Sequence, residues 1–147
     1  MQDLKRYFKK IHNHLDASFN RALRRYGLTS TQFDFLIYLM ENSVDRPTLT
    51  DLASHFGVRH TSAIHVLKIL QDKGFIEKET SSDGRSKIIL LTNQGMRIVT
   101  DVIEKTPLIN SIIFRGFSEN ELHLLEKMLD RISGNLESDA FENMWKV

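Results

Sequence analysis

Hydrophobic residues at the start of the chain recur every three or four positions, which is the spacing of one face of an α-helix. This series comprises Leu4, Phe8, Ile11, Leu15, Phe19, Ala22 and Tyr26. Gly27 follows and predicts the end of this long helix. Thr29 and Gln32 then have the spacing of a capping box, which predicts a second helix ending near Asn42. The apolar residues of this second helix are Phe33, Leu36, Ile37, Leu39 and Met40.

Two shorter helical patterns come next, separated by only three residues. Thr48 and Asp51 have capping-box spacing before a short helix that Gly57 ends. The inward residues of that helix are Leu49, Leu52, Ala53 and Phe56. The next pattern runs over about residues 60–72, with Ala63, Ile64, Leu67 and Leu70 as its apolar residues. We expect Ile64 and Leu67 to hold this helix to the core, and the small Ala63 to leave room for close approach. Two short helices joined by a tight turn that contains glycine form a helix-turn-helix.

A β-hairpin is predicted directly after this motif. Residues 75–80 and 87–91 read as strands, and the polar segment 81–86 between them contains an Asp-Gly turn signal. A helix-turn-helix followed by a hairpin with a polar tip is a winged helix. The predicted fold class is therefore mainly α with a small β-hairpin.

Further helices fill the rest of the chain. Thr92 is a candidate cap for a helix whose inward residues are Met96, Val99, Val102 and Ile103. Pro107 must end or kink that helix, because proline lacks a backbone N–H and clashes with the preceding turn. Ser118 and Glu121 form a capping box before a last helix. The apolar residues of the last helix are Leu122, Leu125, Met128, Leu129 and Ile132.

Several short motifs, in this order and at this spacing, resemble the MarR family of transcriptional regulators. They are LTSTQ at 28–32, LTDLA at 49–53 and KGFI at 73–76. The most specific motif pairs Asp83 with Arg85 and follows them with Leu91 and Thr92, as in the wing signature of the family. The resemblance covers about residues 4–135. It implies one domain over 1–147, with a winged helix-turn-helix lobe at 28–92 and a helical dimerisation lobe formed by 1–27 and 93–147.

Composition narrows the function classes further. The 147 residues include no cysteine, which excludes disulfides, thiolate metal sites and the thiol-peroxide sensing branch of the family. Neither a signal peptide nor a transmembrane run is visible, so we expect a soluble cytoplasmic protein with no membrane partner. The six histidines lack metal-ligand spacing, and no catalytic motif is present. We therefore expect no metal, no cofactor and no enzyme activity.

Charge is unevenly distributed although the net charge is only +1. Residues 1–29 contain seven Lys or Arg and two Asp or Glu, whereas residues 101–147 contain five and nine. A polyanion would therefore be attracted by part of the molecule rather than by the whole.

The second helix of the helix-turn-helix is the candidate recognition helix, since the N-terminal part of such a helix reaches base edges in the major groove. The base-reading candidates are His60, Thr61, Ser62 and His65, and the phosphate or rim candidates are Arg59 and Lys68. The plainer alternative is an ordinary solvated helix start.

In the wing, Arg85 is the candidate for insertion into a minor groove, with Ser86 and Lys87 on the DNA backbone. We expect Asp83 to orient Arg85 or to tie down the turn. Two acidic residues of the first strand, at positions 77 and 79, must point away from DNA or the wing binds weakly. Thr29 and Thr31 are candidate phosphate contacts, although plain helix capping is the favoured role there.

The terminal helices are more apolar than a winged helix of this size needs, which predicts a homodimer. The plainer alternative is that these helices cover their own domain. The interface candidates are Leu4, Phe8, Ile112, Leu125 and Leu129. The family resemblance implies a double-stranded, pseudo-palindromic operator and a small-molecule effector that relieves repression. Its candidate pocket residues are His12, Phe19 and Tyr38, although core packing explains the aromatic residues equally well. The alternative function is a winged-helix module for protein–protein interaction without DNA binding.

Overall fold

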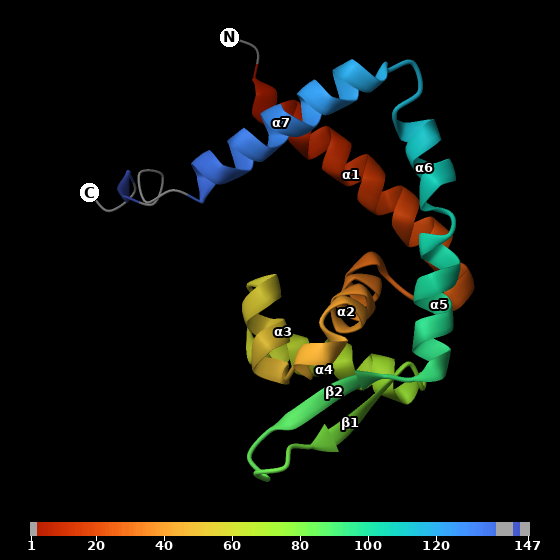
Figure 1. Ribbon diagram of the computed structural model, residues 1–147, viewed down its shortest axis with the longest axis vertical. Helices are drawn as coiled ribbons and strands as arrows, with labels where there is room; N and C mark the ends of the chain where they lie inside the picture. The colour runs from red at the N-terminus through yellow and green to blue at the C-terminus, as the bar shows by residue number, and fades with distance from the viewer. Residues whose placement is uncertain (1–2, 138–142, 145–147) are drawn as a thin grey trace. The chain divides into compact units, whose positions relative to one another are not determined.

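The computed structural model describes residues 3–137 and 143–144 (Figure 1). The chain forms two compact units, residues 1–104 and 105–147. The first contains α1 (Leu4–Leu23), η1 (Arg24–Tyr26), α2 (Ser30–Glu41), η2 (Ser43–Asp45), α3 (Leu49–Phe56), α4 (His60–Asp72), β1 (Ile76–Thr80), β2 (Lys87–Leu91) and α5 (Asn93–Ile103). The second contains α6 (Thr106–Ile113) and α7 (Glu119–Leu136). The mainly α fold with one hairpin confirms the predicted fold class.

Side-chain caps set the starts of α2, α3, α5 and α7. In α2, the Thr29 hydroxyl accepts from the Gln32 backbone N–H at 3.2 Å, and the Gln32 side chain accepts from the Thr29 N–H at 3.1 Å. The same reciprocal capping box begins α3 and α7. In α5, the Thr92 hydroxyl accepts from the Gly95 N–H at 3.1 Å. All four predicted N-caps are confirmed.

The core of the first unit lies around α2, which Figure 1 shows between α3 and α5. Phe35, which the sequence pattern did not select, is 1% exposed and stacks on Phe56 of α3 with ring centroids 4.5 Å apart. The side chains of Leu36, Leu52 and Leu70 are fully buried around it. This core holds the helix-turn-helix in place.

The two strands pair antiparallel, from Ile76 opposite Leu91 to Thr80 opposite Lys87. β1 begins one residue later than predicted, because the Phe75 N–H donates to the Leu70 carbonyl at 3.0 Å and so closes the end of α4. The segment before α3 joins the hairpin, since the Ile89 N–H donates to the Pro47 carbonyl at 2.8 Å. The hairpin is therefore anchored to both ends of the helix-turn-helix.

Gly95 allows α5 to begin directly against the start of the wing. A Cβ atom at this position would lie 2.2 Å from the Phe75 carbonyl oxygen and 3.0 Å from a methyl carbon of Leu91. No side chain fits there, so only glycine permits this close approach. Gly95, Val99 and Val102 then form the buried face of α5.

Three predicted inward residues are wrong in the described chain. Ile64 is 47% exposed, Met96 39% and Ile103 40%. The physical reason is the rotation of each helix about its axis: successive residues are about 100° apart, so a neighbour of a buried residue can face outward. The neighbours Ala63, Gly95 and Val102 are buried in their place, so Ala63 packs in the core rather than leaving room for close approach as expected.

Pro107 separates α5 from α6 rather than lying within one long helix. It occupies the first turn of α6, where a missing N–H costs nothing. Many large hydrophobic side chains of the second unit stay exposed. They include Leu108, Ile112, Phe117, Leu124, Met128, Leu129 and Leu136. The second unit therefore has more apolar surface than it covers by itself.

Candidate nucleic-acid interface

The turn between α3 and α4 aims the start of α4 outward. Gly57 takes the left-handed conformation at φ 60°, and the Val58 N–H donates to the Ala53 carbonyl at 3.0 Å to close α3. Arg59 is the residue before the first turn of α4, in extended conformation. The buried Ala63 and Leu67 then fix which side of α4 faces the core.

All six predicted recognition-helix residues are exposed. They are Arg59, His60, Thr61, Ser62, His65 and Lys68. The His60 Nε2 atom lies 3.3 Å from the Thr50 hydroxyl of α3, which links the starts of the two helices. Thr61, His65 and Lys68 follow one another at steps of three and four, so they share one face. The helix thus presents hydroxyl, imidazole and ammonium groups together.

The wing tip is held by a small network around Asp83. Its carboxylate accepts from the Ser81 hydroxyl and, at 3.0 Å, from the Arg85 backbone N–H. These two hydrogen bonds, the Ser81 bond first, hold the pKa of Asp83 below its usual range. The Ser86 N–H donates to the Ser81 hydroxyl at 3.0 Å. Of the two roles expected for Asp83, the structure supports tying down the turn.

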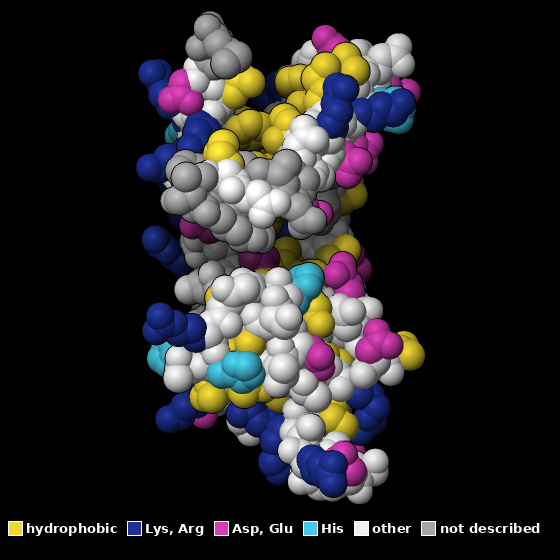
Figure 2. All heavy atoms as spheres, turned by 90° about the vertical axis from the view of Figure 1, so that its left-hand side faces the viewer, with side chains coloured by type: hydrophobic (Ala, Val, Ile, Leu, Met, Phe, Trp, Pro, Cys, Tyr) yellow, Lys and Arg dark blue, Asp and Glu magenta, His cyan; other side chains and the backbone are white. Residues whose placement is uncertain are grey.

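The network around Asp83 does not involve the side chains of the two basic wing residues. Arg85 is exposed and makes no ion pair among the described residues, and Lys87 donates to the Thr80 hydroxyl at 2.6 Å. Glu79 forms a salt bridge with Arg46 at 3.0 Å. That ion pair neutralises one of the two acidic residues of β1. Figure 2 shows Lys and Arg side chains at the bottom of the view, and others along its left edge and near its top.

At the start of α2, the Thr29 hydroxyl is occupied in the capping box, whereas Thr31 is exposed. Ser30 between them is held from α1, because its hydroxyl donates to the Asp16 carboxylate at 2.6 Å and its N–H donates to the Asn20 side chain at 2.9 Å. This arrangement favours the capping role for Thr29.

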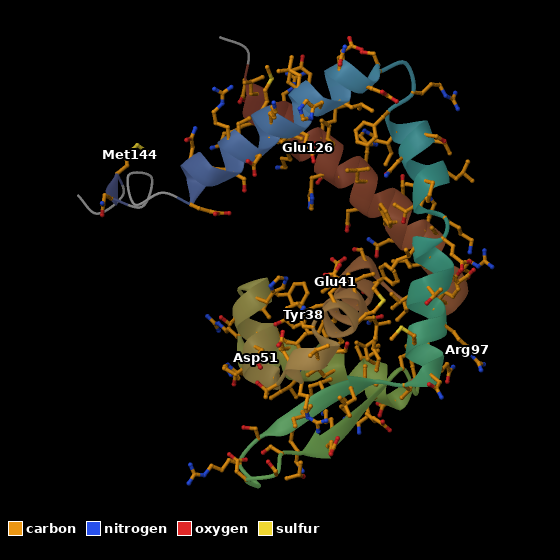
Figure 3. The ribbon with its side chains drawn as sticks, viewed as in Figure 1. Tyr38, Glu41, Asp51, Arg97, Glu126 and Met144 are labelled. Atoms are coloured by element: carbon orange, nitrogen blue, oxygen red, sulfur yellow. The ribbon has the colours of Figure 1, made fainter. Side chains whose placement is uncertain are left out.

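Two of the three candidate effector residues line one cavity. His12 and Phe19 of α1 face a space of about 220 Å³ whose other wall includes Asp34 of α2. Partial burial, and next the nearby carboxylate of Asp16, raise the pKa of Asp34. Tyr38 lies elsewhere, in a neighbouring cavity of about 200 Å³. Figure 3 labels Tyr38 and Glu41, which line that second cavity on α2.

The second unit contains a larger apolar cavity of about 1080 Å³ between α6 and α7. Leu125 and Leu129, two of the predicted interface residues, line it, while Ile112 is 58% exposed. In α1, Leu4 and Phe8 are likewise exposed, at 59% and 42%. Sequence periodicity indicated the apolar faces but not this hollow, because its shape depends on how α6 and α7 pack.

Within residues 3–137 and 143–144, no three His, Asp or Glu side chains are grouped so as to hold a metal ion. In the same part of the chain, each helix is too short or too polar to cross a membrane.

Comparison with known proteins agrees with this geometry. A sequence model of the MarR family matches residues 26–86, the segment from the end of η1 to the wing tip. The fold is similar to that of MepR from Staphylococcus aureus in complex with DNA, with 21% identity over 89% of this chain and 94% of that chain and a TM-score of 0.78. The regulator MarR from Oenococcus oeni PSU-1 is 26% identical over 90% of this chain and 99% of that chain, with a TM-score of 0.71.

A putative MarR family regulator from Listeria monocytogenes, in complex with a 26mer DNA, is 24% identical over 92% of this chain and 90% of that chain, with a TM-score of 0.79. The TM-scores of 0.71 to 0.79 show that these structures share the overall fold of this chain. Residues 26–86 of this chain match the MarR family, and its fold is that of winged-helix transcriptional regulators of this family.

Proposed function

We propose that this chain binds a pseudo-palindromic DNA duplex as a homodimer and represses transcription there until a small molecule releases it. Members of its family are transcription regulators, not enzymes. MepR and the Listeria regulator are themselves described in complex with DNA. The cytoplasmic location expected from the sequence is part of the proposal.

The observation that carries the proposal is the exposed polar face of α4 together with the basic wing. Thr61, His65 and Lys68 lie on a helix whose opposite side is fully buried. Helices seated in this way read base edges in the major groove. Arg85 stands on a braced turn at the hairpin tip, which suits a neighbouring minor groove.

The exposed apolar surface supports the homodimer. Leu4 and Phe8 on α1, and Ile112 and Leu129 in the second unit, are each more than 40% exposed in the single chain. Exposed apolar surface of this extent marks an interaction site. A second copy also supplies the second recognition helix that a pseudo-palindromic site requires.

The cavity that His12 and Phe19 line is the proposed effector site. It lies between α1 and α2, and α2 packs against α5 and β2. A small molecule in this cavity would therefore contact the helix that supports both the wing and the helix-turn-helix. An effector changes DNA affinity only if it binds one arrangement of these elements more tightly than the other.

The test is selection of bound sequences from a random duplex pool, with light scattering on the same protein at micromolar concentration. We expect enrichment of a two-fold sequence whose half-sites lie about one helical turn, roughly 10 bp, apart, and the mass of a dimer. The matched variants are Lys68→Ala in the proposed interface and Lys127→Ala on α7.

Enrichment of no sequence by a dimer would favour a protein–protein interaction module. A monomer that enriches no sequence would refute both the DNA site and the dimer. Equal loss of DNA affinity in the two lysine variants would show that α4 is not the reading helix.

A further inference from the structure

Ile64 is a hydrophobic residue at the centre of the polar face of α4. Thr61, Ile64, His65 and Lys68 follow one another at helical steps, so their side chains form one surface. Ile64 is 47% exposed, whereas its neighbour Ala63 is fully buried and Leu67 is 1% exposed. Ile64 is therefore exposed although the helix that carries it packs firmly against the core.

The surroundings of Ile64 restrict what can cover it. Cationic or hydrogen-bonding side chains flank it on α4, and Arg59 precedes the helix. An apolar protein surface would leave these polar groups without partners, at a cost in free energy. A duplex offers the complementary combination, namely phosphates and polar base edges with one apolar group among them. That apolar group is the C5 methyl of thymine, which lies in the major groove.

We propose that Ile64 is a specificity-determining residue that contacts the C5 methyl of one thymine in each half-site. This inference rests on the proposed function, because it requires α4 to lie in the major groove. The hydroxyl and imidazole groups beside Ile64 read hydrogen-bonding edges, and Ile64 distinguishes thymine from cytosine, which has no methyl there.

The test replaces each thymine of the selected operator, one base pair at a time, with deoxyuridine. This change removes the C5 methyl and leaves the base-pairing edge unaltered. Loss of one methyl-sized apolar contact corresponds to roughly fourfold in affinity, and to roughly 15-fold when both half-sites are changed. We expect one position in each half-site to show this loss with the unmodified protein.

The same duplexes are then measured with Ile64→Ala. This variant should bind the thymine operator several-fold more weakly and should no longer distinguish thymine from deoxyuridine at that position. Val44→Ala, at a residue that is 91% exposed between α2 and α3, is the control and should change neither affinity nor discrimination. Thermal unfolding of both variants verifies that they fold.

The outcomes separate this inference from the function on which it rests. Sequence-specific binding that is insensitive to deoxyuridine at every position would overturn the role of Ile64 and leave the DNA-binding function standing. Unchanged discrimination in Ile64→Ala would assign methyl recognition to another residue. Failure to enrich any duplex would refute the proposed function itself.

Discussion

Replacing Arg85 with alanine should weaken DNA binding and flatten its dependence on salt. Each cation that neutralises a phosphate releases counterions and contributes about 0.9 to the slope of log affinity against log salt. A dimer that engages both wings loses two such cations, which lowers the slope by about 1.8. The ratio of the DNA affinity of the unmodified protein to that of the variant should therefore fall roughly tenfold between about 50 and 200 mM salt.

The wing geometry indicates that Arg85→Ala removes a charge without disturbing the turn. Asp83 holds the turn through the backbone N–H of Arg85 and through the Ser81 hydroxyl. Alanine retains that backbone N–H, so the variant loses the guanidinium and keeps the braced turn. Arg115→Ala removes the same charge from the exposed segment between α6 and α7 and is the matched control.

Fluorescence anisotropy over a salt series measures both slopes. The loss in Arg85→Ala should be larger on sites with A·T-rich flanks, because a narrow minor groove has the stronger negative potential. Thr61→Ala should instead alter sequence preference and leave the slope unchanged, since a hydroxyl releases no counterion. If Arg85→Ala behaves like Arg115→Ala in affinity and slope, the wing does not contact DNA.

Three further predictions concern assembly and stability. The double variant Leu125→Lys and Leu129→Lys should shift the dimer toward monomers in light scattering, because burying a charge in an apolar interface costs free energy. A variant that stays fully dimeric and active would place the interface elsewhere. Gly95→Ala should lower the melting temperature, because the added methyl group clashes with a backbone carbonyl at a cost of about 1–3 kcal/mol. This cost exceeds the gain in helix propensity, which is about 1 kcal/mol. An unchanged melting temperature would refute the close approach. Hydrogen bonds from the backbone N–H and then the hydroxyl of Thr48 hold the pKa of Asp51 below its ordinary value. The ionised carboxylate therefore stabilises the fold at neutral pH, and this contribution is lost as the pH falls through the folded-state pKa. Asp51→Asn should therefore be less stable than the unmodified protein to urea at pH 7, and a difference that persists undiminished at about pH 2 would contradict this linkage.

The sequence alone determined four helix starts and the hairpin. The capping boxes at Thr48 and Ser118 join residues three positions apart, so their spacing along the chain specifies the hydrogen bonds directly. Gly57 ends α3 and Gly84 forms the wing turn for a similar reason: each takes a positive φ, which costs glycine little. The winged-helix topology and the candidate interface residues followed from the order of these local signals.

Only the tertiary structure decided which edge of each apolar face meets the core. Periodicity grouped Ile64 with Leu67, yet packing of α4 buries Ala63 instead and leaves Ile64 on the outer face. The tertiary structure also places Tyr38 in a different cavity from the one that His12 and Phe19 line. A rotation of about 100° distinguishes neighbouring residues on a helix, and that rotation is set by contacts with segments distant in the sequence. Local spacing does not encode those contacts, because they exist only when the distant segments pack together.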